Sequence, residues 1–169
     1  EMLEEIEIQS CRIAKELNLT PPSMEQPQYN MFERQKMEKD YLELFENEGM
    51  GTTIWSPLAS GFLTGKYVDG MPSGTRTSLK NYKFIKDSFE SEEYIDKYQK
   101  VMELKKVAEG LGIPLVHLAL CWCLKNTNVS TVILGASKSE QLIQNIDSVN
   151  FLDRLDDKIM ERIDEILKI

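Results

Sequence analysis

The chain has 169 residues, of which 41% are hydrophobic and 28% charged, and its formal net charge is −8. This length and composition predict one domain with a sizeable core, and the acidic balance argues against nucleic acid or an anionic membrane surface as a partner. No apolar run approaches the roughly 20 residues of a membrane-spanning helix, so no direct membrane insertion is expected and a cytoplasmic location is the default expectation.

The first half of the chain alternates helical and extended patterns. Apolar residues at helical spacing predict a helix over residues 2–17, and a short strand is expected over 23–26, followed by a polar, aromatic loop. A second helix is predicted over 38–48, and a strand over 52–55 follows almost at once. The helix over 38–48 is expected to turn four residues inward, Tyr41, Leu42, Leu44 and Phe45.

The middle of the chain is less regular. Residues 68–88 contain glycine and proline and have poor periodicity, which predicts a long loop with room for one helical turn. Apolar residues from Tyr94 onward predict an amphipathic helix that ends near Gly110. Pro114 suits the first position of a further helix through Leu124, whose nearly continuous apolar residues indicate deep burial.

The last third of the chain begins with a run rich in β-branched residues. Residues 129–134 predict a strand that is buried on both faces of a parallel sheet. The spacing of Ser137 and Glu140 is that of a capping box, with a helix behind it, and a final helix is expected over 155–167. Alternating strands and helices without a hairpin signal predict an α/β sheet or barrel, of which about three parallel strands are visible.

The cysteines and the single histidine do not suggest a metal centre. Cys11, Cys121 and Cys123 are an odd count, which favours buried free thiols in a reducing compartment, and no metal site is expected. His117 is interpreted as a residue of a helix face without a catalytic partner. Glu1 lies in a segment that already has a helical pattern, so we expect the chain to be a piece of a longer protein.

Polar clusters follow each of the three predicted strands. In parallel α/β folds, ligands bind beyond the carboxyl ends of the strands. Gln26 follows the first strand, Trp55 to Ser60 the second and Gly135 to Ser137 the third, which would bring together an amide, an aromatic plane and a helix N-terminus suited to an anion. Each signal also has a plain structural explanation, such as a core tryptophan, a helix cap or solvated cations.

Four segments resemble the C-terminal half of an aldo-keto reductase, most closely the β subunits of Shaker-type voltage-gated potassium channels. The segments are EQPQYNMF (25–32), WSPLASGFLTGKY (55–67), LALCWCLKN (118–126) and VILGASKSEQLIQN (132–145). The resemblance implies that residues 1–169 form the C-terminal part of a single (β/α)8 TIM barrel domain that holds NADP(H). For the full-length parent it implies a homotetramer docked on the cytoplasmic tetramerisation domain of a channel α subunit, at the inner face of the plasma membrane, and a small carbonyl substrate.

The resemblance also assigns cofactor-binding roles by motif position. It implies that Trp55 stacks on the nicotinamide, that Gln26 bonds its carboxamide, and that Lys66 lies at the pyrophosphate. Arg76 and Ser137 would hold the 2′-phosphate, and the residues around Asn145 the adenine. The full implied set is Gln26, Trp55, Ser56, Pro57, Leu58, Ala59, Ser60, Lys66, Arg76, Gly135, Ser137, Gln141, Gln144 and Asn145.

The chain departs from the family pattern at three positions. Ser60 stands where channel subunits usually carry cysteine, Gly74 where an aromatic residue is common, and Gln144 where a carboxylate is expected. The family's catalytic Asp, Tyr, Lys and His come from the first four strands, so no catalytic residue is assigned here. The resemblance therefore predicts the cofactor-binding half of an NADPH-dependent reductase that regulates channels. Two alternatives remain, an aldehyde or ketone reductase unrelated to channels and an inactive fragment that serves only as an interaction module.

Overall fold

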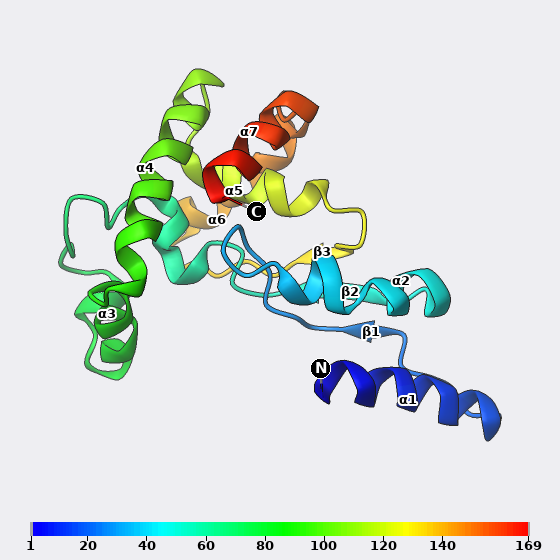
Figure 1. Cartoon of the computed structure of the whole chain (residues 1–169). Helices are drawn as coiled ribbons and strands as arrows, with labels where there is room; N and C mark the ends of the chain where they lie inside the picture. Colours follow the sequence, from blue (N-terminus) through cyan, green and yellow to red (C-terminus); the bar gives the residue numbers. More distant parts are fainter. Residues whose placement is uncertain (1, 169) are drawn as a thin grey trace. The chain divides into compact units, whose positions relative to one another are not determined.

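The computed structural model describes residues 2–168, which form two compact units (Figure 1). The first unit contains the residues up to Pro57 together with Cys123–Gly135, and the second contains Leu58–Trp122 and the residues from Ala136 onward. Strands and helices alternate as the sequence predicts, and the three strands are parallel, as expected for part of a (β/α)8 barrel.

The first unit is built on a parallel sheet of order β1-β2-β3. Glu25 of β1 is paired with Thr52 of β2, and Ile54 of β2 is paired with Val132 of β3. Because all three strands run in one direction, their carboxyl ends lie at the same edge. The strands are β1 (Met24–Glu25), β2 (Gly51–Ile54) and β3 (Thr131–Val132).

The prediction that residues 129–134 form a strand buried on both faces is wrong in two respects. Only Thr131 and Val132 are in strand β3, and Ile133 is 37% exposed. The strand β3 lies at an edge of the three-stranded sheet, where it is paired with β2 on one side only. By contrast, Ile54 in the central strand is completely buried.

Two helices and a π-helical turn accompany the sheet in the first unit. Cys11 of α1 and Tyr41, Leu44 and Met50 form a small buried core there. Leu42, which we expected to point inward, is exposed. A five-residue π-helix precedes α2, and its wider turn rotates the following residues relative to a continuous α-helix. The bounds are α1 (Met2–Glu16), the π-helix η1 (Lys36–Asp40) and α2 (Leu42–Glu48).

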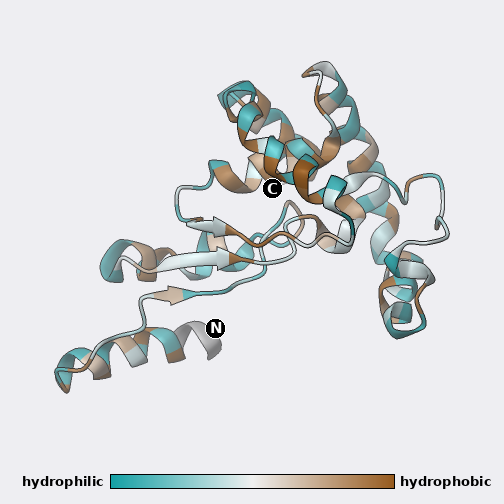
Figure 2. Cartoon of the chain, turned by 180° about the vertical axis from the view of Figure 1, so that it is seen from behind, coloured by the Kyte–Doolittle hydropathy of each residue, from teal (hydrophilic) through white to brown (hydrophobic). Residues whose placement is uncertain are grey.

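The second unit is mainly helical. Its elements are η2 (Ala59–Thr64), η3 (Arg76–Ser78), η4 (Lys80–Tyr82), α3 (Lys83–Phe89), α4 (Glu93–Gly110), α5 (Leu115–Lys125, whose last residues from Cys123 belong to the first unit), α6 (Ser139–Asp147), η5 (Ser148–Arg154) and α7 (Asp157–Leu167). Figure 2 shows apolar and polar residues interspersed along these helices, as expected where one face of a helix is buried.

The loop predicted over residues 68–88 contains more structure than expected. Two 3₁₀ turns lead into α3, a full helix whose Ile85 and Phe89 are buried four residues apart. That spacing places both side chains on one helix face, and packing of this face explains the helix despite the polar residues around it.

An aromatic cluster forms the core of the second unit beside α3 and α4. The Phe62 ring lies 4.8 Å from the rings of Phe89 and Tyr98 and 5.0 Å from that of Tyr94. In the same unit, α4 packs against α7. The N-cap residue of α7, Asp156, accepts a hydrogen bond from the Ile159 amide.

Candidate functional site

In the first unit, the predicted site residues lie beyond the carboxyl ends of the strands. Gln26 follows β1 directly, Trp55 follows β2, and Gly135 lies three residues after β3. Trp55 is 45% exposed although its neighbour Ile54 is buried. An exposed indole at the end of a central strand is available to a ligand, whereas a tryptophan of the core would be covered.

The backbone of Trp55 is held on both sides by the segment after β1. Its amide donates to the Pro27 carbonyl at 3.0 Å, and its carbonyl accepts from the Tyr29 amide at 3.2 Å. These bonds extend the β1-β2 pairing past the strand ends, so the position of the indole is set by the sheet.

Ser56, the next residue, has a left-handed backbone with φ of 56°. Such a conformation is unfavourable for a residue with a side chain and persists only where its surroundings impose it. Buried Asn30 contributes to this, because its Nδ2 donates to the Ser56 carbonyl at 3.0 Å while its Oδ1 accepts from the amides of Phe32 and Glu33. Asn30 is not among the site residues predicted from the sequence, and only its membership of a turn-forming residue class could have indicated it.

In the second unit, the chain continues through a strained turn of small residues. Ala59 and Ser60 have φ of 47° and 57°, and Gly61 has φ of 92°. The amides of Gly61 and Leu63 both donate to the Leu58 carbonyl, at 2.8 and 3.1 Å, which closes the turn. Strain of this kind is concentrated at binding sites, where backbone must come close to a ligand.

Gly61 makes room for Lys66. A Cβ atom at Gly61 would lie 3.1 Å from the Lys66 Nζ, which is closer than ordinary contact. The same Nζ lies 5.0 Å from the centroid of the Tyr67 ring, so the ring face helps to hold the ammonium group above the turn. The turn and its cation therefore form one local unit that suits an anion.

The predicted capping box at Ser137 and Glu140 does not form. The N-cap of α6 is Lys138, without a side-chain cap bond, because the helix begins one residue later than the motif requires. Instead Oε1 of Gln141 accepts from both the amide and the hydroxyl of Ser137, at 3.0 and 3.1 Å. The two predicted residues are thus joined, while on the same helix Gln144 is exposed and Asn145 is buried.

A family model described as "Aldo/keto reductase family" matches residues 3–168. The chain belongs to the aldo/keto reductase family. It is also 46% identical over 155 residues to a Schizosaccharomyces pombe protein named "Putative voltage-gated potassium channel subunit beta". The alignment covers 92% of this chain and 45% of that relative, so the chain spans about half the length of the relative.

Arg76 of this aldo/keto reductase chain lies in a strongly basic segment. Between Asp69 and Asp87 the sequence has four cations and no carboxylate, although the whole chain has a net charge of −8. Arg76 is exposed on η3. A local positive field in an acidic protein favours an anionic ligand. The cations are Arg76, Lys80, Lys83 and Lys86.

The tyrosines with clearly shifted pKa values are not suited to proton donation by an aldo/keto reductase at neutral pH. Burial raises the pKa of Tyr29, Tyr41 and Tyr98 above the ordinary value of 10.0. A tyrosine that acts as an acid needs a lowered pKa.

The high pKa of Tyr29 predicts a loss of stability in alkali. Burial is the main cause, and the Glu38 carboxylate, which accepts from the Tyr29 hydroxyl at 2.7 Å, adds to it despite an opposing bond from Asn126. Above pH 10 the folded state keeps the Tyr29 proton while the unfolded chain loses it. The contribution of Tyr29 to the free energy of unfolding is therefore complete below about pH 10 and falls by about 1.4 kcal/mol per pH unit above it. Urea unfolding between pH 8 and 11 should show a shallower decline for Tyr29→Phe, and an unchanged slope would contradict this.

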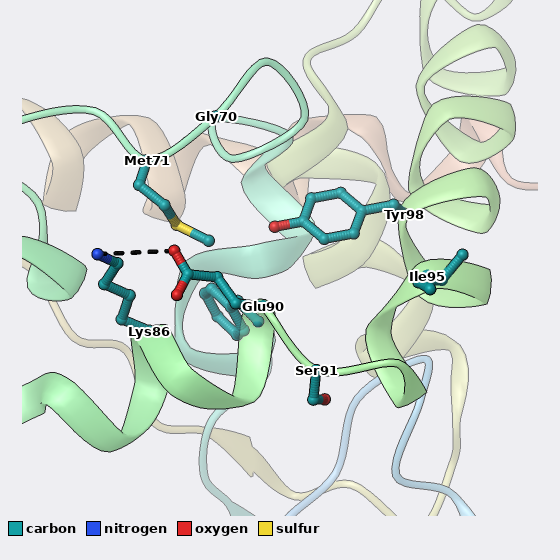
Figure 3. A pocket seen from close by; sticks show the side chains of 8 residues that line it. Gly70, Met71, Lys86, Glu90, Ser91, Ile95 and Tyr98 are labelled. Carbon is teal, nitrogen blue, oxygen red and sulfur yellow. Dashed lines mark ion pairs between the residues drawn. The ribbon is translucent and has the colours of Figure 1, made fainter.

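A separate open pocket of about 510 Å³ lies in the second unit. Figure 3 shows Met71, Glu90 and Tyr98 pointing into it, with Lys86 paired to Glu90 at 3.6 Å. None of the predicted cofactor residues lines this pocket, and we assign it no role in the candidate site.

The described residues contain neither a cluster of metal-binding side chains nor a single membrane-spanning helix. Among the side chains of residues 6–168, no three His, Cys, Asp or Glu gather as a metal site, and the three buried cysteines form no disulfide. Within the same range no single helix has the length and apolarity to cross a bilayer, whereas α4 and α5, which meet at 92°, pass such a test only as a bent pair.

Proposed function

We propose that this chain supplies part of the NADP(H) site of an aldo/keto reductase barrel, as the C-terminal part of one barrel domain over residues 1–169. The observation that carries the proposal is Trp55, whose exposed indole is held at the carboxyl end of the central strand by backbone bonds on both sides. Membership of a reductase family and the anion-suited turn at Gly61 and Lys66 support it.

The residues of the two units have chemistry that fits different parts of this cofactor. In the first unit the Trp55 plane suits the nicotinamide, and the Gln26 amide, exposed beside β1, suits its carboxamide. In the second unit Lys66 and the turn from Leu58 to Ser60 suit the pyrophosphate, and Arg76 suits a phosphomonoester. A guanidinium in a segment free of carboxylates favours NADPH over NADH.

When bound, NADPH supplies a hydride for a carbonyl carbon. The residues of this chain would hold and orient the cofactor. Trp55 would keep the nicotinamide flat against one wall, and Asn30 would keep the adjoining Ser56 turn in its left-handed form. The proton donor would come from elsewhere in the natural protein, because the family resemblance places the catalytic Asp, Tyr, Lys and His on the first four strands of the barrel.

Replacement of Trp55 by alanine tests this proposal. Loss of a stacking plane should raise the Kd of the natural full-length protein for NADPH about tenfold. Phe84→Ala is the matched control, because Phe84 is a more exposed aromatic residue outside the candidate site, and its Kd should equal that of the wild type. Equal affinities of the wild type and the Trp55 variant in a fluorescence titration would contradict the assignment.

A second function is favoured by the relative whose name describes a potassium channel β subunit, which is 46% identical to this chain. We propose on that basis that the natural protein assembles as a homotetramer on the cytoplasmic tetramerisation domain of a channel α subunit. Co-purification with such a domain tests the association. Reduction of an aromatic aldehyde by the same protein, compared with a variant that lacks its catalytic tyrosine, separates an active reductase from a purely regulatory module.

A further inference from the structure

His117 on α5 is buried and forms a hydrogen bond with the helix that carries the proposed adenine-binding residues. The side chain is 4% exposed, and its Nε2 lies 2.8 Å from the main-chain carbonyl oxygen of Gln144 on α6. Because a carbonyl oxygen can only accept, the imidazole donates from Nε2. The bond joins residues 27 positions apart, so it links two separate helices of the second unit.

The Gln144 carbonyl lies in the last turn of α6, where helical carbonyls lose their regular partners. The amide of the C-cap residue Ser148 donates to Asn145 and Ile146 instead of to Gln144. His117 therefore satisfies a carbonyl that the end of the helix does not pair in the regular way. Because the bonded carbonyl directly precedes Asn145, the bond bears on the position of a residue proposed to bind adenine.

The His117 ring is itself held in a fixed orientation. It stacks on Phe151 of η5, with the ring centroids 4.9 Å apart and the planes at 25°. On Phe151 lies the Arg154 guanidinium, 4.8 Å from the ring centroid, and Arg154 donates to the Leu111 carbonyl at 2.7 Å. This series of contacts leaves the imidazole little freedom, so its N–H direction determines where the Gln144 peptide lies.

We infer that His117 is a positioning residue that fixes the Gln144–Asn145 backbone for the adenosine end of the cofactor. The inference rests on the proposed NADP(H) site. The Gln144 carbonyl belongs to the peptide group that joins Gln144 to Asn145. Rotation of this group would therefore move the exposed Gln144 side chain and the buried Asn145 side chain together. A small displacement of ligand-binding groups is enough to weaken binding considerably.

Two substitutions separate the donor from the ring. His117→Phe keeps an aromatic ring against Phe151 but has no donor, and His117→Gln keeps an amide donor without the ring. In the natural full-length protein, His117→Phe should raise the Kd for NADPH and for 2′,5′-ADP about tenfold, because the Gln144 carbonyl loses the donor that holds it and the peptide can shift toward another partner. The Kd for reduced nicotinamide mononucleotide should change less than twofold, and His117→Gln should restore the 2′,5′-ADP affinity to within about threefold of wild type.

Val101→Ala on α4 is the control for a general loss of stability, because Val101 is fully buried and lies outside α5, α6 and η5. This substitution should lower the free energy of unfolding without changing the Kd for either half of the cofactor, 2′,5′-ADP or reduced nicotinamide mononucleotide. The inference is overturned if His117→Phe binds 2′,5′-ADP like the wild type, if both half-ligands weaken equally, or if the control weakens 2′,5′-ADP as much. If His117→Phe does not fold, a failure of His117→Gln to retain 2′,5′-ADP binding overturns it. In all these cases the proposed function stands as long as the wild-type protein binds NADPH. Absence of NADPH binding by the wild type would overturn both the proposed function and the role of His117.

Discussion

Replacement of Phe62 by alanine should lower the free energy of unfolding by about 3–5 kcal/mol, the usual cost of removing a large side chain from a packed core. Phe62 is 1% exposed, and its ring is surrounded by those of Phe89, Tyr94 and Tyr98 at centroid distances of 4.8–5.0 Å. The loss combines buried apolar area, edge-to-face ring contacts and the cavity that remains. Because Phe62 follows the turn of Ala59 to Gly61, the same substitution should loosen the proposed pyrophosphate-binding segment.

Thermal or urea unfolding of the natural protein measures this effect. Phe84→Ala provides the comparison, because Phe84 lies in the same unit but is 63% exposed, and its substitution should change stability by less than about 0.5 kcal/mol. Similar losses for the two variants would show that the aromatic cluster does not form the core described here.

Replacement of Arg76 by glutamate should raise the Kd for NADPH about a hundredfold and change the Kd for NADH less than threefold. A guanidinium can form two charge-assisted hydrogen bonds with a phosphomonoester, and the substituted carboxylate would repel the same group. Only NADPH carries this phosphate, so the loss should be specific to it. Equilibrium titration with both nucleotides measures the ratio.

Lys83→Glu separates a specific contact from the general field of the basic segment. It introduces the same charge change seven residues away, on the exposed surface of α3. If only the local field matters, both variants should weaken NADPH to a similar degree. The proposed role of Arg76 requires that Lys83→Glu raise the Kd for NADPH less than about fivefold, because a screened charge without direct contact contributes little.

The sequence predicts those features that depend on neighbouring residues. The periodicity of Val101, Leu104 and Ala108 predicts α4, and the order of strands and helices predicts a parallel sheet. The predicted strand over 52–55 included Trp55, whereas β2 ends at Ile54 and Trp55 is the first residue after it. Family motifs then supply the expected roles, and the structure places Gln26, Trp55 and Gly135 after successive strands.

Features that depend on distant residues or on backbone strain could not be predicted. Ala59 and Ser60 have left-handed φ values although neither is glycine, and a sequence pattern does not reveal such strain. The contact of His117 with a main-chain carbonyl on another helix could not be predicted, because it joins residues 27 positions apart. The phase of Leu42 depends on a π-turn ahead of α2, which periodicity with 3.6 residues per turn does not capture.

The central claim is that this chain forms part of an NADP(H) site, and titration of the natural full-length protein with NADPH and NADH tests it most directly. The account predicts one nucleotide bound per chain, with NADPH bound more than about tenfold tighter than NADH because only NADPH offers a phosphomonoester to Arg76. Absence of binding, or equal affinity for the two nucleotides, would contradict it.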